Sequence, residues 1–191
     1  MTFLKLSISI LAYVVLLSVN ACSSESKGDN ANRVGMNATG KSAAAKTPAT
    51  PKGTSGRKAP GFELTDLKGN SLKWSQYDGK VVLVDFWATW CGPCRRSIPD
   101  LSDLHQKYSD RGFEVLGISL DQTGPEGVSQ FVAKMNIPYR VAIGNLRLAQ
   151  DWDIGDAIPV AFLVNRQGNI VEKFVGYQDR AALVKKIEKY L

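Results

Sequence analysis

The stretch VVLVDFWATWCGPC, residues 81–94, runs from an apolar segment directly into two cysteines separated by Gly-Pro. Its first part, VVLVDFW, has the length and β-branched content of a strand buried on both faces. Beyond the cysteines, apolar side chains recur at helical spacing, at Ile98, Leu101, Leu104 and Tyr108. The sequence therefore predicts a strand that leads into a helix, with Cys91 at or just before the first helical residue.

Cys91 is thereby placed where a thiolate is stabilised. Unpaired backbone N–H groups and the helix dipole favour an anion at a helix amino terminus, and they lower the pKa of a thiol there. Cys94 lies about one helical turn away, so the two sulfur atoms can come within bonding range. Pro93 suits the first turn, where a missing N–H costs no hydrogen bond. The spacing predicts a redox pair in which Cys91 attacks a partner's disulfide and Cys94 releases the reduced partner.

Asp85 is a carboxyl group within the otherwise apolar run, six residues before Cys91. Burial should raise its pKa, because a low-dielectric environment disfavours the charged form. A carboxyl with a raised pKa is suited to take the proton from Cys94 when that thiol becomes the second nucleophile. The alternative is a structural polar group that takes no part in the reaction.

Strand and helix signals alternate along the rest of the chain. FELTDLKGNSLKW, residues 62–74, is predicted as a hairpin with a type II′ turn at Gly69-Asn70, because glycine supplies the positive φ. Further strands are expected at 113–120, 139–144, 160–164 and 170–176, and further helices at 125–135, 145–154 and 179–190. The last two strands form a second hairpin around residues 165–169. This order indicates an α/β fold with a mixed central sheet.

The segment VDFWATWCGPC, residues 84–94, resembles the active-site segment of the thioredoxin superfamily, and the resemblance extends over residues 59–191. The predicted first hairpin and residues 125–144 resemble the TlpA/ResA-like envelope oxidoreductases. The resemblance implies a thioredoxin-like fold: a central mixed β-sheet flanked by helices, with an added N-terminal β-hairpin and a helix/strand insertion before a cis-proline loop. It also implies a protein-disulfide reductase that works without a cofactor.

The same resemblance indicates which residues contact a substrate. Ile158-Pro159, in the segment AIPVAFLV, corresponds to the cis-proline loop, which packs opposite the two cysteines and presents its backbone to a substrate strand. Trp90 adjoins the first cysteine and is expected to line the same surface, together with Gly92 and Pro93.

The chain departs from the TlpA/ResA-like pattern at two positions where an acidic side chain is present or absent. Many members have a glutamate three residues after the second cysteine, where this chain has Ser97. Many lack an aspartate at the position of Asp85, so in this respect, and in its Gly-Pro dipeptide, the site is closer to thioredoxin. The combination favours a reductant over a strong oxidant.

The cysteine pair has three alternative functions. A copper or zinc carrier would need more sulfur or imidazole ligands. The single histidine, His105, lies about 16 Å further along a helix, so no metal site is expected. A peroxiredoxin-like thiol peroxidase normally has a Pro-x-x-x-Thr-x-x-Cys motif, whereas Thr89 lies two residues before Cys91 without a suitable proline. A structural disulfide is disfavoured because so short a loop removes little entropy from the unfolded chain.

Residues 1–22 have one early lysine, an apolar run and a small residue before Cys22, the pattern of an export signal. The ending Val-Asn-Ala-Cys resembles a bacterial lipobox, so we expect lipidation at Cys22; an uncleaved anchor and ordinary signal cleavage are the alternatives. Residues 23–58 are rich in Ser, Ala, Gly, Lys, Thr and Pro, and we expect a flexible linker. All three alternatives place the domain at 59–191 outside the cytoplasm, in a bacterial cell envelope.

The net charge of +6 does not indicate a nucleic-acid partner. Residues 59–191 contain 16 basic and 16 acidic side chains, so the excess lies upstream of the domain. By resemblance, the partners are oxidised envelope proteins, with apocytochrome c as one candidate, and a membrane thiol transporter of the DsbD or CcdA type as electron donor. The protein is expected to be a monomer held at the membrane through its lipid anchor.

Overall fold

The structure, a computed structural model, describes residues 56–191. The predicted signal, Cys22 and most of the predicted linker lie outside this part. The elements in order are β1 (Glu63–Thr65), β2 (Ser71–Lys73), η1 (Trp74–Tyr77), β3 (Val81–Trp87), α1 (Gly92–Tyr108), η2 (Ser109–Arg111), β4 (Phe113–Ser119), α2 (Pro125–Lys134), β5 (Arg140–Ile143), α3 (Leu146–Asp151), β6 (Val160–Val164), β7 (Ile170–Val175) and α4 (Arg180–Glu188).

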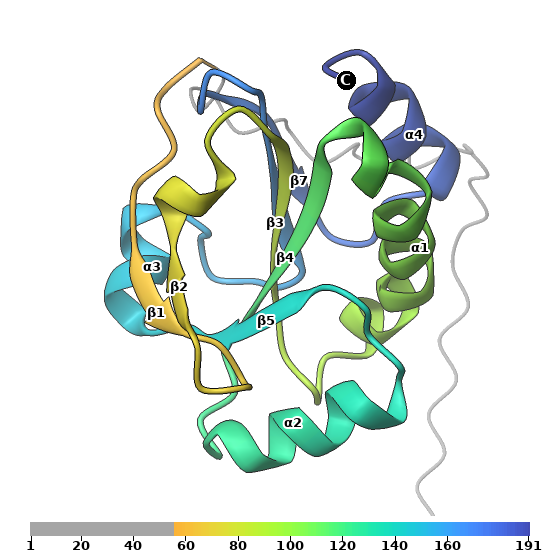
Figure 1. The fold of residues 1–191 in the computed structure, drawn as a ribbon. Helices are drawn as coiled ribbons and strands as arrows, with labels where there is room; N and C mark the ends of the chain where they lie inside the picture. The colour runs from red at the N-terminus through yellow and green to blue at the C-terminus, as the bar shows by residue number, and fades with distance from the viewer. Residues whose placement is uncertain (1–55) are drawn as a thin grey trace, which may run out of the picture. The chain divides into compact units, whose positions relative to one another are not determined.

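A five-stranded sheet in the order β5-β4-β3-β6-β7 forms the centre of the fold (Figure 1). The strands β3, β4 and β5 are parallel, and β6 and β7 run antiparallel to their neighbours. The predicted mixed sheet is therefore confirmed. Because β3 and β4 are parallel neighbours, the loops after both strands meet at the same edge of the sheet.

The central strand β3 is buried along its whole length, because both faces of the sheet are covered. Leu83 and Trp87 belong to the core cluster that includes side chains of α1 and α4. Val84 and Phe86 belong to a second cluster with side chains of α3 and the first hairpin. Figure 1 shows these elements on opposite sides of the sheet. Asp85 therefore points toward the α1 side, since side chains alternate along a strand.

The first hairpin forms as predicted, but the prediction of a two-residue type II′ turn was wrong. Thr65 pairs with Ser71, so the loop spans residues 66–70 instead of two residues. The Gly69 N–H donates to the Asp66 carbonyl (3.0 Å), and Gly69 takes a positive φ of 83° at the end of this longer turn. The Asp66 carboxylate accepts the N–H groups of Lys68 and Asn70, both at 2.9 Å, which stabilises the longer loop.

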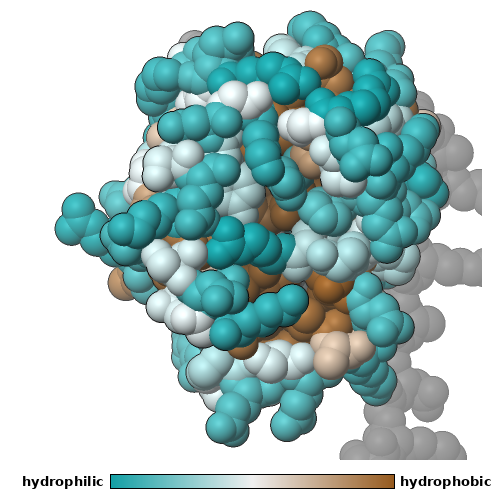
Figure 2. Space-filling model, in the orientation of Figure 1, coloured by the Kyte–Doolittle hydropathy of each residue, from teal (hydrophilic) through white to brown (hydrophobic). Residues whose placement is uncertain are grey.

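This hairpin forms a sheet of its own and meets β5 through a bridge between Asp66 and Ala142. A hollow of about 500 Å³ lies between them, lined by Leu67, Ile137 and Tyr139 among others. Seen from the side of Figure 1, the surface is mostly hydrophilic, and hydrophobic surface shows in hollows between polar side chains (Figure 2). The added hairpin thus lies next to β5, the edge strand of the central sheet.

Residues 56–58, which the sequence analysis assigned to the linker, pair with the strand β7 and the turn before it. The Gly56 N–H donates to the Ile170 carbonyl (2.6 Å), and the Ile170 N–H donates to the Arg57 carbonyl (2.8 Å). Lys58 forms a bridge with Asn169. The last three residues of the predicted linker therefore pair with the start of β7. Within residues 56–191, no helix has the length and apolar character needed to cross a bilayer.

Candidate active site

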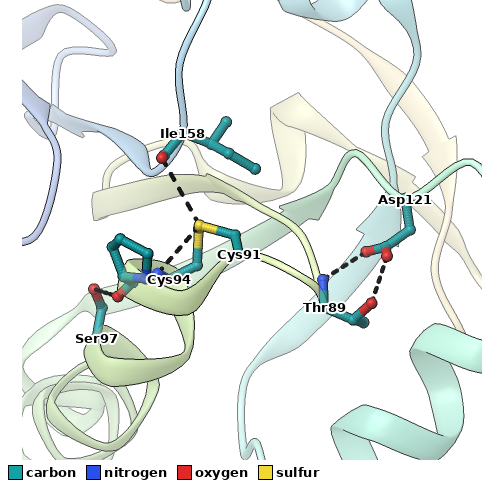
Figure 3. Close-up of a disulfide and its surroundings, with 7 residues drawn as sticks. Thr89, Cys91, Cys94, Ser97, Asp121 and Ile158 are labelled. Carbon is teal, nitrogen blue, oxygen red and sulfur yellow. Dashed lines mark hydrogen bonds between the residues drawn. A yellow bond between two sulfur atoms is a disulfide. The ribbon is translucent and has the colours of Figure 1, made fainter. Parts of the chain in front are cut away.

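Cys91 and Cys94 form a disulfide at the start of α1, with a sulfur–sulfur distance of 2.04 Å. Cys91 is the N-cap residue, and its sulfur accepts the backbone N–H of Cys94 at 3.3 Å (Figure 3). Pro93 occupies the first turn. The predicted strand-to-helix arrangement is thus present, and a backbone donor of the helix terminus points at the sulfur of Cys91. Such a donor stabilises negative charge on that atom.

The two sulfur-bearing residues differ in accessibility. Cys94 is fully buried, whereas Cys91 keeps 4% of its surface accessible. Gly92 and Pro93 are exposed, and Trp90 is 70% exposed. A partner can therefore approach the disulfide over these three residues and reach Cys91 first.

The peptide bond between Ile158 and Pro159 is cis. The Ile158 carbonyl oxygen lies 3.8 Å from the Cys91 sulfur (Figure 3). In the disulfide this sulfur carries no proton, so the approach is a contact, and a reduced Cys91 thiol could donate there. The Pro159 carbonyl accepts the N–H of Gly176 at 2.8 Å, which fixes the loop to the end of β7. The structure thus brings the cis-proline loop and the cysteine pair together.

Asp85 is 2% exposed, and its Oδ2 atom has no hydrogen-bond partner within residues 56–191. Its register neighbours are Gly117 on β4 and Ala161 on β6, and neither residue offers a polar or basic side chain. Burial without a counter-charge raises the pKa of Asp85 to about 7. A carboxyl with this pKa can accept or release a proton near neutral pH.

A small cavity of about 20 Å³ reaches the Asp85 side chain and is also lined by Ser97, Pro159 and Gln178. The surface of this cavity is mostly apolar, and its volume is just large enough for one water molecule. The Ser97 hydroxyl donates to the Pro93 carbonyl (3.2 Å), so it is held by the first turn of α1. Asp85 therefore lines a cavity together with residues of α1 and of the cis-proline loop.

Tyr139 is a neighbour of Asp85 that the sequence analysis missed. A Cβ atom at Gly117 would lie 3.0 Å from the Trp87 Nε1 atom and 3.3 Å from a ring carbon of Tyr139, so both rings occupy the space that glycine leaves. Burial raises the pKa of Tyr139 well above its usual value, and the charge of Asp85 adds to this effect. The sequence feature that could have indicated this contact is Gly117, because a glycine inside a core strand often marks a place where another group approaches the backbone closely.

Thr89 and Asp121 form a clamp on the turn that carries Trp90. The Asp121 carboxylate accepts the Thr89 N–H (2.9 Å) and the Thr89 hydroxyl (2.5 Å), as Figure 3 shows, and also the Ser119 hydroxyl (2.8 Å). Asp121 is 6% exposed, and these three donors satisfy its buried charge. The clamp ties the turn before Cys91 to the end of β4. Thr89 and Asp121 are 32 positions apart in the chain, so local sequence patterns do not predict their contact.

His105 lies near the end of α1, where it contacts β4 and not the cysteines. Its Nδ1 accepts the Val115 N–H at 3.3 Å, and its ring lies edge-on to Tyr139, with ring centres 6.0 Å apart. Within the described residues, no group of three or more His, Cys, Asp or Glu side chains is arranged to hold a metal ion. The role of His105 visible here is to connect helix and sheet.

A cysteine pair that closes to a disulfide at a helix amino terminus, beside a cis-proline loop on a mixed sheet, carries out thiol-disulfide exchange. These features define a thiol-disulfide oxidoreductase with a thioredoxin-like fold. The chain belongs to the Redoxin family, whose pattern it matches over residues 54–191. Its likeness to the TlpA/ResA-like members is confirmed by the relatives that follow.

Thiol-disulfide oxidoreductase ResA from Bacillus cereus is 33% identical over 135 residues, which cover 70% of this chain and 77% of that protein. A thiol:disulfide interchange protein of the thioredoxin family from Chlorobium tepidum TLS has a similar structure, with a TM-score of 0.65 and 26% identity. That match covers 71% of this chain and 96% of the other. The thioredoxin domain of thiol-disulfide oxidoreductase BVU-2223 from Bacteroides vulgatus matches with a TM-score of 0.62 and 29% identity, over 73% and 98% of the two chains.

The substitution Asp85→Asn should remove a pH dependence of stability. Unfolded aspartate ionises near pH 3.8 and native Asp85 near about 7, so the native state holds an extra proton between these values. The free energy of unfolding of the oxidised protein therefore falls as the pH rises through this window, by on the order of 4 kcal/mol in total. Urea denaturation at several pH values measures the slope.

The matched control is Asp156→Asn, which changes an exposed carboxyl group near the site and should keep the wild-type slope. Equal slopes for the wild type and Asp85→Asn would show that Asp85 is already ionised in the native protein at low pH.

The Thr89–Asp121 clamp is tested by Thr89→Val, which removes the hydroxyl donor but keeps the shape and the backbone N–H. We expect the free energy of unfolding to fall by about 1.5–3 kcal/mol, because a buried carboxylate loses one of its donors. The looser turn should also raise the pKa of the reduced Cys91 thiol, seen as about threefold slower alkylation by iodoacetamide at neutral pH. Thr89→Ser should restore both values. An unchanged alkylation profile in Thr89→Val would limit the clamp to a role in stability.

Proposed function

We propose that this protein reduces disulfides of other proteins outside the cytoplasm, with Cys91 as the attacking and Cys94 as the resolving thiol. The observation that carries this proposal is the Cys91–Cys94 disulfide at the amino terminus of α1, in which Cys91 alone of the pair keeps accessible surface. The relatives named as thiol-disulfide oxidoreductases support the same chemistry.

The reaction begins from the reduced pair. The Cys91 thiolate attacks one sulfur of the substrate disulfide; a mixed disulfide forms, the substrate bond breaks, and the other substrate sulfur leaves as a thiolate that takes up a proton. The Cys94 thiolate then attacks the Cys91 sulfur, and the second substrate thiol is released. Two electrons pass from the cysteine pair to the substrate, and the pair ends as the disulfide seen here.

Asp85 serves the second step as the base for Cys94. Cys94 is fully buried, so its proton needs an acceptor inside the protein. Asp85 points to the same side of the sheet as Cys94, and its raised pKa of about 7 matches this task. The cavity that Asp85 shares with Ser97 and Gln178 is large enough for one water molecule, which would accept the proton from Asp85.

The substrate lies over Trp90, Gly92 and Pro93 and against the backbone of Ile158 and Pro159. The exposed Trp90 ring offers apolar contact area, and the two small exposed residues after Cys91 leave the sulfur approachable. The Ile158 carbonyl stands 3.8 Å from the same sulfur, where it can meet the backbone of an extended segment.

The proposed location and partners are supported by the amino-terminal part of the sequence and by the family resemblance. The export-signal pattern of residues 1–22 and its lipobox-like ending support lipidation at Cys22 and attachment to the outer side of a membrane. There, a membrane thiol transporter of the DsbD or CcdA type would return electrons to the disulfide. The proposed substrates are oxidised envelope proteins, with apocytochrome c as one candidate.

The reduction potential of the Cys91–Cys94 pair tests the direction of electron flow. Equilibration of the full chain, in detergent, with glutathione or thioredoxin couples can be followed by Trp fluorescence. We expect a reduction potential of about −270 mV, as for thioredoxin, or somewhat above it, because the Gly-Pro pair and Asp85 match that reductant. A value near about −120 mV would identify an oxidant that inserts disulfides.

Single cysteine variants test the two roles. Cys91→Ser should abolish the reduction of insulin disulfides, because the attacking sulfur is gone. Cys94→Ser should accumulate mixed disulfides, visible on non-reducing gels, because the resolving step is blocked. Cys22→Ser is the control, since it removes a cysteine outside the pair and should keep turnover in detergent. Turnover retained by Cys91→Ser would refute the assignment.

A further inference from the structure

Exposed apolar side chains gather around the disulfide. Among residues 56–191, four large hydrophobic side chains are exposed: Trp90 (70%), Leu146 (75%), Val175 (50%) and Tyr177 (43%). Trp90 precedes Cys91, and Val175 and Tyr177 flank Gly176, whose N–H donates to the Pro159 carbonyl. Three of the four therefore border the redox site. An apolar patch with aromatic rings is typical of a surface that contacts another protein.

Two arginines extend this patch along α1. The Arg95 N–H donates to the Cys91 carbonyl at 3.1 Å, so Arg95 lies one turn after the attacking cysteine on the same side of the helix. Its guanidinium lies over the Phe131 ring, 5.7 Å from the ring centre. The Arg96 guanidinium lies over the Tyr177 ring at 5.4 Å. The two aromatic rings thus hold the charged groups at the border of the patch.

Both arginines are exposed, and neither guanidinium forms a salt bridge within the described residues. The nearby carboxylates lie mainly on the Arg96 side, where the charges of Asp100 and Asp179 both act on the Tyr177 ring that Arg96 covers. Asp100 accepts the Tyr177 hydroxyl at 3.3 Å and so lies on the Arg96 side. Asp156 stands in the loop two residues before Ile158. Arg95 and Arg96 are consecutive residues, so they place two positive charges together beside the disulfide.

We infer that Arg95 and Arg96 select partners that carry acidic side chains next to the disulfide to be reduced. This inference rests on the proposed function and names the class of substrate for the same site. Guanidinium groups bind carboxylates through paired N–H donors, and these two have donors to spare. The aromatic patch supplies contact area that any partner can use, whereas the arginines favour acidic partners. Charge complementarity at such a border acts mainly on the rate of encounter.

Three matched peptides test the inference. Each carries one cysteine linked by a disulfide to a fluorescent reporter, and the residues flanking the cysteine are Glu, Gln or Lys. The second-order rate constant for reduction by the pre-reduced full chain, in detergent, is measured in single turnover. At low ionic strength we expect the Glu peptide to react about fivefold faster than the Gln peptide, and the Lys peptide to react more slowly than both. High salt should remove the difference.

The double variant Arg95→Gln/Arg96→Gln should lose the preference for the Glu peptide. The ratio of rates is the readout, because a changed reactivity of Cys91 would alter all three peptides alike. Arg147→Gln/Lys185→Gln is the matched control: it removes the same charge from exposed positions on α3 and α4 and should keep the ratio.

The outcomes separate the inference from the proposed function. Equal rates for the Glu and Lys peptides, or a preference that survives in the double arginine variant, would overturn the inference while leaving the reductase activity intact. If none of the three peptides is reduced, the proposed function itself fails.

Discussion

The burial of β3 on both faces is the constraint on which the rest of the structure depends. A strand in the middle of the sheet, covered by α1 and α4 on one side and by α3 and the first hairpin on the other, has no freedom in register. Its direction fixes where the chain leaves the sheet and therefore where Cys91 caps the helix. Its alternation places the single carboxyl group of the strand, Asp85, on the side of α1. One buried element thus sets the positions of both the reactive sulfur and the acid.

The two groups, the Cys91 sulfur and the Asp85 carboxyl, experience opposite electrostatic environments. At Cys91, a backbone N–H of the helix terminus favours negative charge on sulfur. At Asp85, burial and the glycine and alanine neighbours disfavour negative charge on oxygen. The helix terminus thus favours the thiolate of Cys91, whereas burial favours the protonated form of Asp85. In the proposed mechanism, the less acidic carboxyl group takes the proton of the other cysteine, Cys94, and a carboxyl with a pKa of about 7 can release that proton again near neutral pH, which suits a site that is alternately oxidised and reduced.

Local patterns in the sequence were sufficient for the main elements. The apolar run, the helical spacing after it and the cysteine pair predicted β3, α1 and the position of Cys91, and an acid within an apolar strand predicted the burial of Asp85. The errors and omissions concern contacts that local patterns do not describe. The first turn was assigned from Gly69-Asn70 alone, whereas the side chain of Asp66 stabilises a longer loop. Tyr139 and Asp121 reach the site only through the pairing of β3 with β4 and of β4 with β5.

Because residues 56–58 pair with the start of β7, the chain enters the fold at the opposite end of this strand from the redox site. The chain enters the fold beside Ile170, whereas the opposite end of the same strand, at Val175 and Gly176, borders the cis-proline loop. The six residues of β7 span about 20 Å at the usual rise of a strand. A protein coupled to an electrode or a bead through the residues ahead of Gly56 would therefore keep its disulfide at the far end of the sheet from the point of entry, open to partners from solution.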